Sequence, residues 1–255
     1  MKALHILLLS AAFSIISFNA TRDRPVIYGT KAPKNSLQYM VSMQWNCEHI
    51  CGGFLIHPSY VLTAAHCRHS DLSVVNGTHD INPSRSNLRR HKVAKIHPHP
   101  SYNQPIDGYN IMLLELSERV NLNEDVKTIR IPSKNNWIYM PCQVAGWGQN
   151  TSENGKQVND LMVTEVPIIS TEVCRKEWEG KSINLPYNIL CAGGYQTTHG
   201  ACQEDSGGPL VCNGVAVGIV SFNYMNNCNY PDVPNVYTDI SSYTDWIHDV
   251  IHRHA

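Results

Sequence analysis

The chain has 255 residues, and its 20 lysines and arginines nearly balance its 21 aspartates and glutamates. Such a low, balanced charge gives no basic surface of the kind that nucleic acid requires, so a nucleic-acid partner is not expected. After the first 25 residues, no stretch is long and apolar enough to cross a bilayer. The composition therefore favours a soluble protein without a membrane span.

The first 25 residues have the features of an export signal. Lys2 precedes an apolar run from Ala3 to Phe18, and the small residue Ala20 comes before the charged stretch 22–24. This order is typical of a secretory signal peptide, whereas a buried helix is the alternative interpretation. We assign 1–25 to a signal peptide and short propeptide. We expect a secreted protein, with storage in secretory granules as one form of export.

The cysteines and glycosylation sequons agree with export. Nine cysteines in an exported chain favour disulfides over metal ligands, and we expect no metal or cofactor. Asn76-Gly77-Thr78 and Asn150-Thr151-Ser152 match the acceptor sequence for N-linked glycans. The histidine pairs at 97 and 99 and at 248 and 252 have spacings that could chelate a metal, but exposed histidines explain them better.

Short apolar segments separated by Gly, Pro, Asn and Ser run from Val26 to Asp239. Asn213-Gly214 supplies the two positive-φ residues of a tight hairpin between 209–212 and 215–220. Strands this short and this closely spaced favour an all-β fold of barrels or sandwiches. Two helices are predicted as well.

The first predicted helix covers 170–179, with Ser170 as its cap and Gly180 as its stop. The second closes the chain, with apolar residues at amphipathic spacing after a capping box formed by Ser242 and Asp245. We expect this second helix to dock on the body of the protein as a structural element.

Two motifs carry residues typical of nucleophilic catalysis. Residues 63–67 read Thr-Ala-Ala-His-Cys, and about 140 residues after His66 the segment 205–210 reads Asp-Ser-Gly-Gly-Pro-Leu. A lone histidine or serine is most often structural, but this ordered pair is highly specific. A serine oxygen becomes a nucleophile when an imidazole takes its proton. His66 and Ser206 fit these two roles.

The order and surroundings of these motifs resemble the chymotrypsin family of serine endopeptidases, from Val26 to the C-terminus. The start Val26-Ile27-Tyr28-Gly29, with 39–44 and 51–56, looks most like the granzyme and mast-cell protease branch. The resemblance implies two packed six-stranded antiparallel β-barrels with the site between them. It places the first barrel at about 26–130, the second at about 131–240 and the C-terminal helix at about 241–253.

Two departures from the family pattern affect the catalytic machinery. The family's acid stands before an apolar strand, and Asn110 takes its place here. Asp107 lies nearby, but the resemblance puts it beside the histidine ring, where it is not expected to compensate. The family's oxyanion-hole donors would be the N–H groups of 204 and 206, and a glutamate stands where the family has glycine. We expect Glu204 to turn its N–H away and to bring negative charge toward a developing oxyanion.

The resemblance also implies the substrate pocket. Its floor would be Gly200, so no acid awaits a lysine or arginine side chain, and Ser221 would lie on one wall. Asn223 and Asn235 would form further walls, where many relatives have glycine. We expect a narrowed pocket that admits only a small or polar side chain.

Processing and disulfides follow from the same resemblance. Asp205 would pair with the new N-terminal ammonium of Val26 after activation of a zymogen, but Arg24-Pro25 is a poor site for the usual activating cut. Cys47 is left over, as a buried unreactive thiol, an exposed free thiol or one half of an interchain bridge. The implied disulfides are Cys51–Cys67, Cys142–Cys212, Cys174–Cys191 and Cys202–Cys228.

Two functions from different classes remain open. The first is a secreted, granzyme-like serine endopeptidase that is strongly impaired by Asn110 and Glu204. The alternative is a non-catalytic homologue that binds a protein or peptide partner or acts as a decoy. We expect a monomer. One basic run could bind a heparin-like glycan, although a solvated edge strand explains it better: Arg85, Arg89, Arg90, His91, Lys92 and Lys95.

Overall fold

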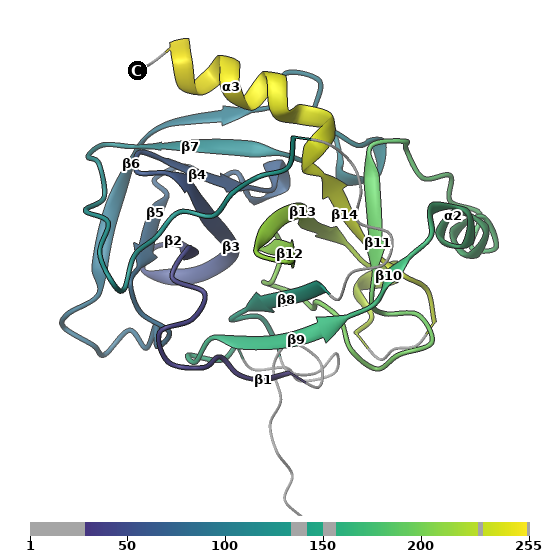
Figure 1. The fold of residues 1–255 in the computed structure, drawn as a ribbon, viewed down its shortest axis with the longest axis horizontal. Coiled ribbons are helices and arrows are strands. Elements are labelled where there is room, and N and C mark those ends of the chain that lie inside the picture. The colour runs from purple at the N-terminus through teal and green to yellow at the C-terminus, as the bar shows by residue number, and fades with distance from the viewer. Residues whose placement is uncertain (1–28, 134–141, 150–156, 229–231, 254–255) are drawn as a thin grey trace, which may run out of the picture.

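The computed structural model describes residues 29–133, 142–149, 157–228 and 232–253. In these ranges, two antiparallel strand systems lie side by side, one built from β2–β7 and the other from β1 and β8–β14 (Figure 1). The leader 1–25, Val26 and the sequon at Asn150 lie outside the described residues. None of the described helices is long and apolar enough to span a membrane.

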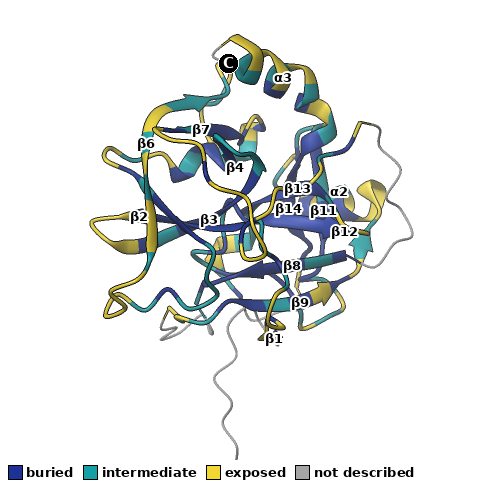
Figure 2. Ribbon diagram, turned by 60° about the vertical axis from the view of Figure 1, so that its left-hand side comes forward, coloured by how far each residue is buried: buried dark blue, intermediate teal, exposed yellow. Residues whose placement is uncertain are grey.

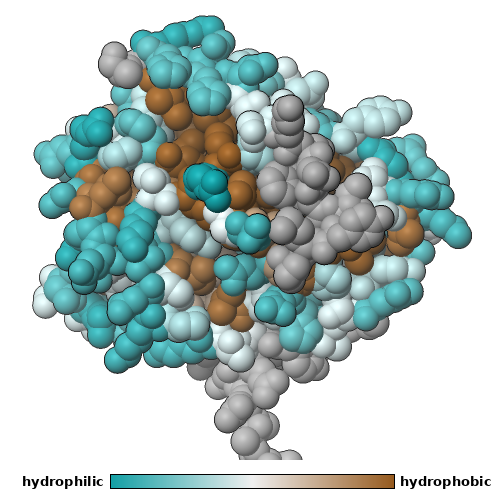
Figure 3. Space-filling model, in the orientation of Figure 1, coloured by the Kyte–Doolittle hydropathy of each residue, from teal (hydrophilic) through white to brown (hydrophobic). Residues whose placement is uncertain are grey.

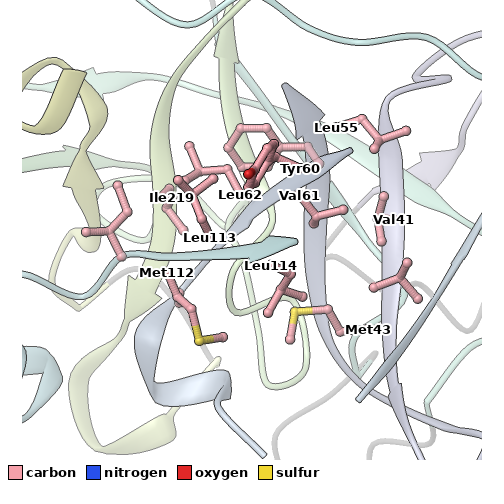
Figure 4. Close-up of a cluster of buried hydrophobic side chains, with 14 of the residues drawn as sticks. Val41, Met43, Leu55, Tyr60, Val61, Leu62, Met112, Leu113, Leu114 and Ile219 are labelled. Carbon is pink, nitrogen blue, oxygen red and sulfur yellow. The ribbon is translucent and has the colours of Figure 1, made fainter. Parts of the chain in front are cut away.

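The first strand system is a closed barrel with the strand order β2-β3-β4-β7-β6-β5. Val41, Met43, Leu55, Val61 and Leu114 are fully buried and belong to its core (Figure 4). These apolar positions explain why the sequence forms strands here, because the buried faces of short strands meet inside a closed barrel. The strands are β2 Met40–Trp45, β3 Glu48–His57, β4 Tyr60–Thr63, β5 Ser73–Asn76, β6 Arg89–Pro98 and β7 Met112–Leu116.

The second strand system is an open eight-stranded sheet, ordered β1-β9-β8-β12-β13-β14-β11-β10. The expectation of a second closed six-stranded barrel is corrected to a half-barrel. Its six central strands are flanked by β1 and β10, which have two residues each and do not pair with one another. The strands are β1 Thr30–Lys31, β8 Cys142–Gly146, β9 Met162–Val166, β10 Ile168–Ile169, β11 Ile189–Ala192, β12 Pro209–Cys212, β13 Val215–Phe222 and β14 Asn235–Asp239.

The predicted turn and the first predicted helix are both present. Asn213 and Gly214 have φ values of 48° and 74° and join β12 to β13 as a tight hairpin. Helix α2 spans Thr171–Glu179, and the Ser170 hydroxyl accepts a hydrogen bond from the N–H of Val173 at its start. Gly180 ends the helix as expected.

The C-terminal helix begins differently from the prediction. A short 3₁₀ turn, η4 Ile240–Tyr243, leads directly into α3 Thr244–Arg253. The carboxylate of Asp239 accepts hydrogen bonds from the N–H and hydroxyl of Ser241, so Asp239 caps this unit instead of the expected box at Ser242. The 3₁₀ turn moves the cap three residues toward the N-terminus.

Each end of the described chain packs on the half that it does not belong to by sequence. β1 pairs with β9 of the second sheet, while α3 lies over the first barrel, where Ile247 is buried in the barrel core (Figure 1). The outer face of α3 and much of β6 are exposed (Figure 2). Apolar atoms show beneath α3 in Figure 3, and a groove of about 790 Å³ there includes Ile129, Ile131 and Ile251 in its lining.

The disulfides are those expected, and none joins the two halves. Cys51–Cys67 lies in the first barrel, and the other three lie in the second half. Cys47 is a free, exposed cysteine. The expectation of an N-linked glycan at Asn76 is corrected. The side chain of Asn76 is 2% exposed, and its amide nitrogen is enclosed by the protein. A glycan at Asn76 does not fit this structure.

Candidate active site

The three residues expected to act in catalysis meet where the two halves join. Asn110 precedes β7, and the pairing of Thr63 with Met112 brings it beside His66, which lies in the 3₁₀ turn η1 (Ala65–Cys67). Ser206 comes from the other half, just before β12. The N–H of Gly52 in β3 donates to the carbonyl of Ser206 over 2.8 Å, which ties the two halves together at the site.

Asn110 is fully buried and holds His66 through three contacts. Its Oδ1 accepts the backbone N–H of His66 at 3.0 Å. Its Nδ2 donates to the hydroxyl of Ser221 at 2.7 Å and lies 2.9 Å from Nδ1 of His66, closer than Oδ1 at 3.2 Å. Because the backbone N–H needs an acceptor, Oδ1 must face it, and the amide group is thereby oriented. Both amide atoms are thus within hydrogen-bond distance of Nδ1, and the shorter contact favours donation from Nδ2 to Nδ1.

The Nδ2 contact favours one tautomer of His66 over the other. When Nδ1 accepts a hydrogen bond, the neutral ring carries its proton on Nε2. Burial also lowers the pKa of His66, which favours the neutral ring. A protonated Nε2 cannot take the proton of a serine hydroxyl. Among the described residues, no hydrogen bond joins Ser206 Oγ to His66.

Asp107 does not replace the missing acid. Its two carboxylate oxygens accept hydrogen bonds from the side-chain amides of Asn103 and Gln104, each over 2.9 Å. These two bonds lower the pKa of the exposed Asp107 carboxyl. The carboxylate is therefore held within its own loop, away from the Nδ1 side of His66.

Glu204 adopts a left-handed backbone conformation, which favours glycine. Its φ is 69°, and the N–H of Asp205 donates to the carbonyl of Cys202 over 3.2 Å, as in a type II turn with Glu204 at the third position. At negative φ, the turn would be type I and the peptide between 203 and 204 would be flipped. This turn favours an N–H that keeps its place, and the expectation that glutamate turns it away stays a prediction. Keeping it in place costs about 1–2 kcal/mol of strain.

The N–H groups at the expected oxyanion hole are free to bind a ligand. Among the described residues, neither Glu204 nor Ser206 donates its backbone N–H to a protein acceptor. The side chain of Glu204 contacts Gln149, and its Oε1 accepts a hydrogen bond from the Gln149 side-chain amide over 3.2 Å. Burial raises the pKa of the Glu204 carboxyl. A carbonyl oxygen could therefore still receive two donors.

His49 supports this turn from the first barrel, and sequence reasoning missed it. Its Nε2 donates to the carbonyl of Glu204 over 3.1 Å, and its Nδ1 accepts from the hydroxyl of Ser42 over 2.8 Å. Burial lowers the pKa of His49 to about 4. A possible signal was the pair of polar residues at buried positions of neighbouring strands, since buried polar side chains need partners.

Asp205 is fully buried behind the turn. Its carboxylate oxygens accept the N–H groups of Gly148 and Cys202, each over 2.9 Å. Burial raises the pKa of Asp205 to about 7. A Cβ at Gly146 would lie 2.1 Å from one carboxylate oxygen, so only glycine fits there. The expected ammonium partner, Val26, lies outside the described residues.

The cavity next to His66 and Ser206 has a volume of about 230 Å³ and is narrowed by amide side chains. Asn235 is 2% exposed, and its Oδ1 accepts the N–H of Ala201 over 3.2 Å. Asn223 and Ser221 also line the cavity. Gly200, the expected floor, is buried and is absent from the described lining. Asn235 and Ala201, which are hydrogen-bonded to each other, line the cavity where Gly200 was expected.

Gln203 also lines this cavity and was missed by sequence reasoning. Its Nε2 donates to the backbone carbonyl of Asn226, and its Oε1 lies beside the disulfide Cys202–Cys228. The amide thus connects the 202–204 wall to the 224–228 wall. No local sequence signal marks such a contact, because the two walls meet only in the folded chain.

Comparison with known proteins agrees with this architecture. The family model described as Trypsin matches residues 26–247. The chain belongs to the trypsin family. Because this match spans both halves and the site between them, the trypsin-family frame applies to the whole described domain.

The trypsin-family relatives match almost the full chain. Serine protease 1 of Rattus norvegicus is 36% identical over 96% of this chain and 98% of its own length. Kallikrein-7 of Homo sapiens is 35% identical, with 98% and 96% covered. The solved structure of neuropsin, a serine protease expressed in the limbic system of mouse brain, superposes with a TM-score of 0.81 at 33% identity, covering 88% of this chain and 99% of that chain.

Proposed function

We propose that this trypsin-family protein is secreted and holds peptide segments in its cleft while hydrolysing them at a negligible rate. The observation that carries the proposal is the 2.9 Å contact between Nδ2 of Asn110 and Nδ1 of His66. It supports a His66 ring that is protonated on the side of Ser206 and cannot act as its base. The same exchange in another serine protease lowers kcat about 10⁴-fold through the wrong tautomer.

The second candidate is a slow endopeptidase, which the free N–H groups of Glu204 and Ser206 favour. Loss of one oxyanion donor typically costs about 10²–10³ in rate, and this loss is not supported here. His66 and Ser206 are also both present in the cavity wall. A peptide carbonyl would bind in either case, so the two candidates differ in turnover and share the ligand.

The finer expectations about partners have unequal support. The start of the mature chain still favours granule storage of the granzyme kind. Cys47 is exposed, which leaves an interchain bridge open in an otherwise monomeric protein. Several side chains of the basic run already have partners within the protein. Arg85 forms an ion pair with Asp80, and Arg89 forms one with Asp125. Arg90 donates hydrogen bonds to two polar side chains. These contacts favour a structural role over glycan binding.

The test is covalent labelling of Ser206 by a phosphonate with an alanine-sized side chain. We would compare the chain starting at Val26 with Asn110→Asp, Glu204→Gly and the double variant, using Ser206→Ala as the blank. We expect no labelling of the unmutated chain and prompt labelling once Asn110 is replaced by aspartate. Prompt labelling of the unmutated chain at Ser206 would refute negligible turnover and favour the slow endopeptidase.

A further inference from the structure

The cavity beside Ser206 contains one charged group without a counter-charge. Among its described lining residues, only His66 and Glu204 are ionisable. His66 is held neutral by burial, which lowers its pKa, so Glu204 alone sets the charge of the wall. Asp205 lies directly behind and is also acidic, so it adds no positive charge. The cleft is therefore electronegative at this point.

The carboxylate of Glu204 is only half satisfied. Oε1 accepts one hydrogen bond, from the neutral amide of Gln149, whereas Oε2 is enclosed and has no partner. Among the described residues, no lysine, arginine or histidine forms an ion pair with Glu204. A buried carboxylate oxygen without a donor is unfavourable, so a folded protein usually supplies one. A bound molecule with a donor group could supply it.

The position of Glu204 indicates which part of a peptide could supply this donor. Its carboxylate contacts Gln149, which lies in the segment after β8 and outside the lining of the cavity, whereas Asn235 and Ala201 belong to that lining. If the residue before the bond over Ser206 fills that cavity, the residues after the bond face Gln149. Gln149 is only half-buried, so its side chain can move aside.

We propose that Glu204 binds a lysine or, preferably, an arginine side chain among the first two residues that follow the bond lying over Ser206. This inference rests on the proposed binding of peptides in the cleft. A guanidinium would replace the Gln149 amide at Oε1 and give Oε2 its missing donor, because its planar fork matches both carboxylate oxygens. Glu204 is the one acid among the described residues that line the cavity, so a basic residue would be recognised at this wall and not at the expected floor.

The test uses Ser206→Ala protein, so that binding is measured without cleavage. The probes are fluorescein-labelled peptides Ala-Ala-Ala-Ser-X-Ala and Ala-Ala-Ala-Ser-Ala-X with amidated C-termini, where X is arginine or its neutral isostere citrulline. Fluorescence anisotropy is read at pH 8, because an alkaline pH favours the charged carboxylate of Glu204 against its raised pKa, and at both low salt and about 0.5 M salt. The matched control is Glu204→Gln, which keeps the side-chain length and removes the charge.

We expect arginine to be preferred over citrulline by on the order of tenfold at low salt at one of the two positions. The preference should shrink at high salt and disappear in Glu204→Gln. Gln149→Ala, which removes the competing amide, should increase it. Equal binding of the two peptides, an arginine preference that persists in Glu204→Gln, or no binding of any probe up to about 1 mM would each overturn the proposal.

The outcome of this peptide-binding experiment is independent of the outcome of the labelling experiment that tests turnover. Phosphonate labelling of the unmutated chain reports on the Ser206 nucleophile and needs no basic side chain in the probe. Labelling could therefore refute negligible turnover while the arginine preference is still observed. Conversely, an unlabelled protein could show equal affinity for arginine and citrulline, and only the role of Glu204 would fall.

Discussion

Nδ2 of Asn110 lies 2.9 Å from Nδ1 of His66, on the side where an acid would accept a proton. The amide cannot turn round, because its Oδ1 receives the backbone N–H of the same histidine over 3.0 Å. A single side chain thus both positions the imidazole and favours one of its tautomers. This dual contact explains how the site can keep its geometry and lose its base.

The tautomer can be observed directly. We predict that the neutral His66 ring carries its proton on Nε2 in the unmutated chain and on Nδ1 in Asn110→Asp, because a carboxylate can only accept. The ¹⁵N chemical shifts of the labelled imidazole distinguish the two forms. A ring protonated on Nδ1 in the unmutated chain would mean that Asn110 faces it with Oδ1.

Restoring the acid should restore turnover. Asn110→Asp should raise the rate of Ser206 acylation by a small-side-chain ester by about 10³–10⁴-fold, since that is the usual size of this loss. Asn110→Ala is the matched control, because it removes the Nδ2 donor without supplying a charge. A comparable gain in Asn110→Ala would show that relief of the wrong tautomer is sufficient and that the charge contributes little.

Glu204 should be a locally destabilising residue. Glu204→Gly removes a strained positive φ and a carboxylate oxygen that has no hydrogen-bond partner. We therefore expect the free energy of unfolding to increase by about 1–2 kcal/mol. Chemical denaturation measures this difference. Glu204→Ala separates the two causes, since alanine removes the carboxylate and keeps the strain. A glycine variant no more stable than the alanine variant would indicate that strain contributes nothing.

The stability of the unprocessed chain should depend on pH through the carboxyl group of Asp205. Burial raises its pKa from 3.8 to about 7 in the folded state. The folded state then holds a proton that the unfolded state has released, so this contribution to stability is complete below about pH 4 and is lost as the pH rises through 7. In a chain that starts at Val26, an ammonium paired with Asp205 would reverse the sign.

The measurement compares urea unfolding of the unprocessed chain and its Asp205→Asn variant between pH 4 and pH 8. His49 acts in the opposite direction: its pKa is lowered from 6.5 to about 4, so its contribution is lost as the pH falls through this range. His49→Gln therefore serves as a second background that isolates the carboxyl. A difference between the chain and Asp205→Asn that does not change with pH would contradict the burial effect.

The narrowed cavity should open on removal of its amide side chains. In the Asn110→Asp background, Asn235→Gly and Asn223→Gly together should shift acylation from alanine-sized toward phenylalanine-sized esters, because both amide side chains line the cavity. Gln203→Ala tests the amide of Gln203 separately. An unchanged preference for small side chains would show that residues other than these amides set the size limit.

The sequence motifs were sufficient to predict the main site residues, because each motif consists of residues that are adjacent in the chain. His66, Asn110 and Ser206 meet in the structure, and the disulfide pairs implied by the resemblance are all present. The fold class also followed from short strands and a hairpin turn. These features depend on residues that are close in sequence or on a frame shared by the family.

The remaining details depend on partners from distant segments. The orientation of the Asn110 amide is set by a backbone N–H and by Ser221, and the φ of Glu204 is held within a turn that His49 supports from the other half. The half-barrel and the cap at Asp239 were also missed. Sequence pattern alone carries no distance between such segments, so these contacts could not be predicted.

The covalent connections of the molecule have a further consequence for limited digestion. Every disulfide stays within one half, so the two halves share only the connection from 117 to 141. Non-covalent contacts nevertheless join the two halves: strand β1 pairs with β9 of the second sheet, and helix α3 packs on the first barrel. A protein nicked once in that connection should still migrate as one particle under native conditions, and separate into two chains in detergent without any reductant.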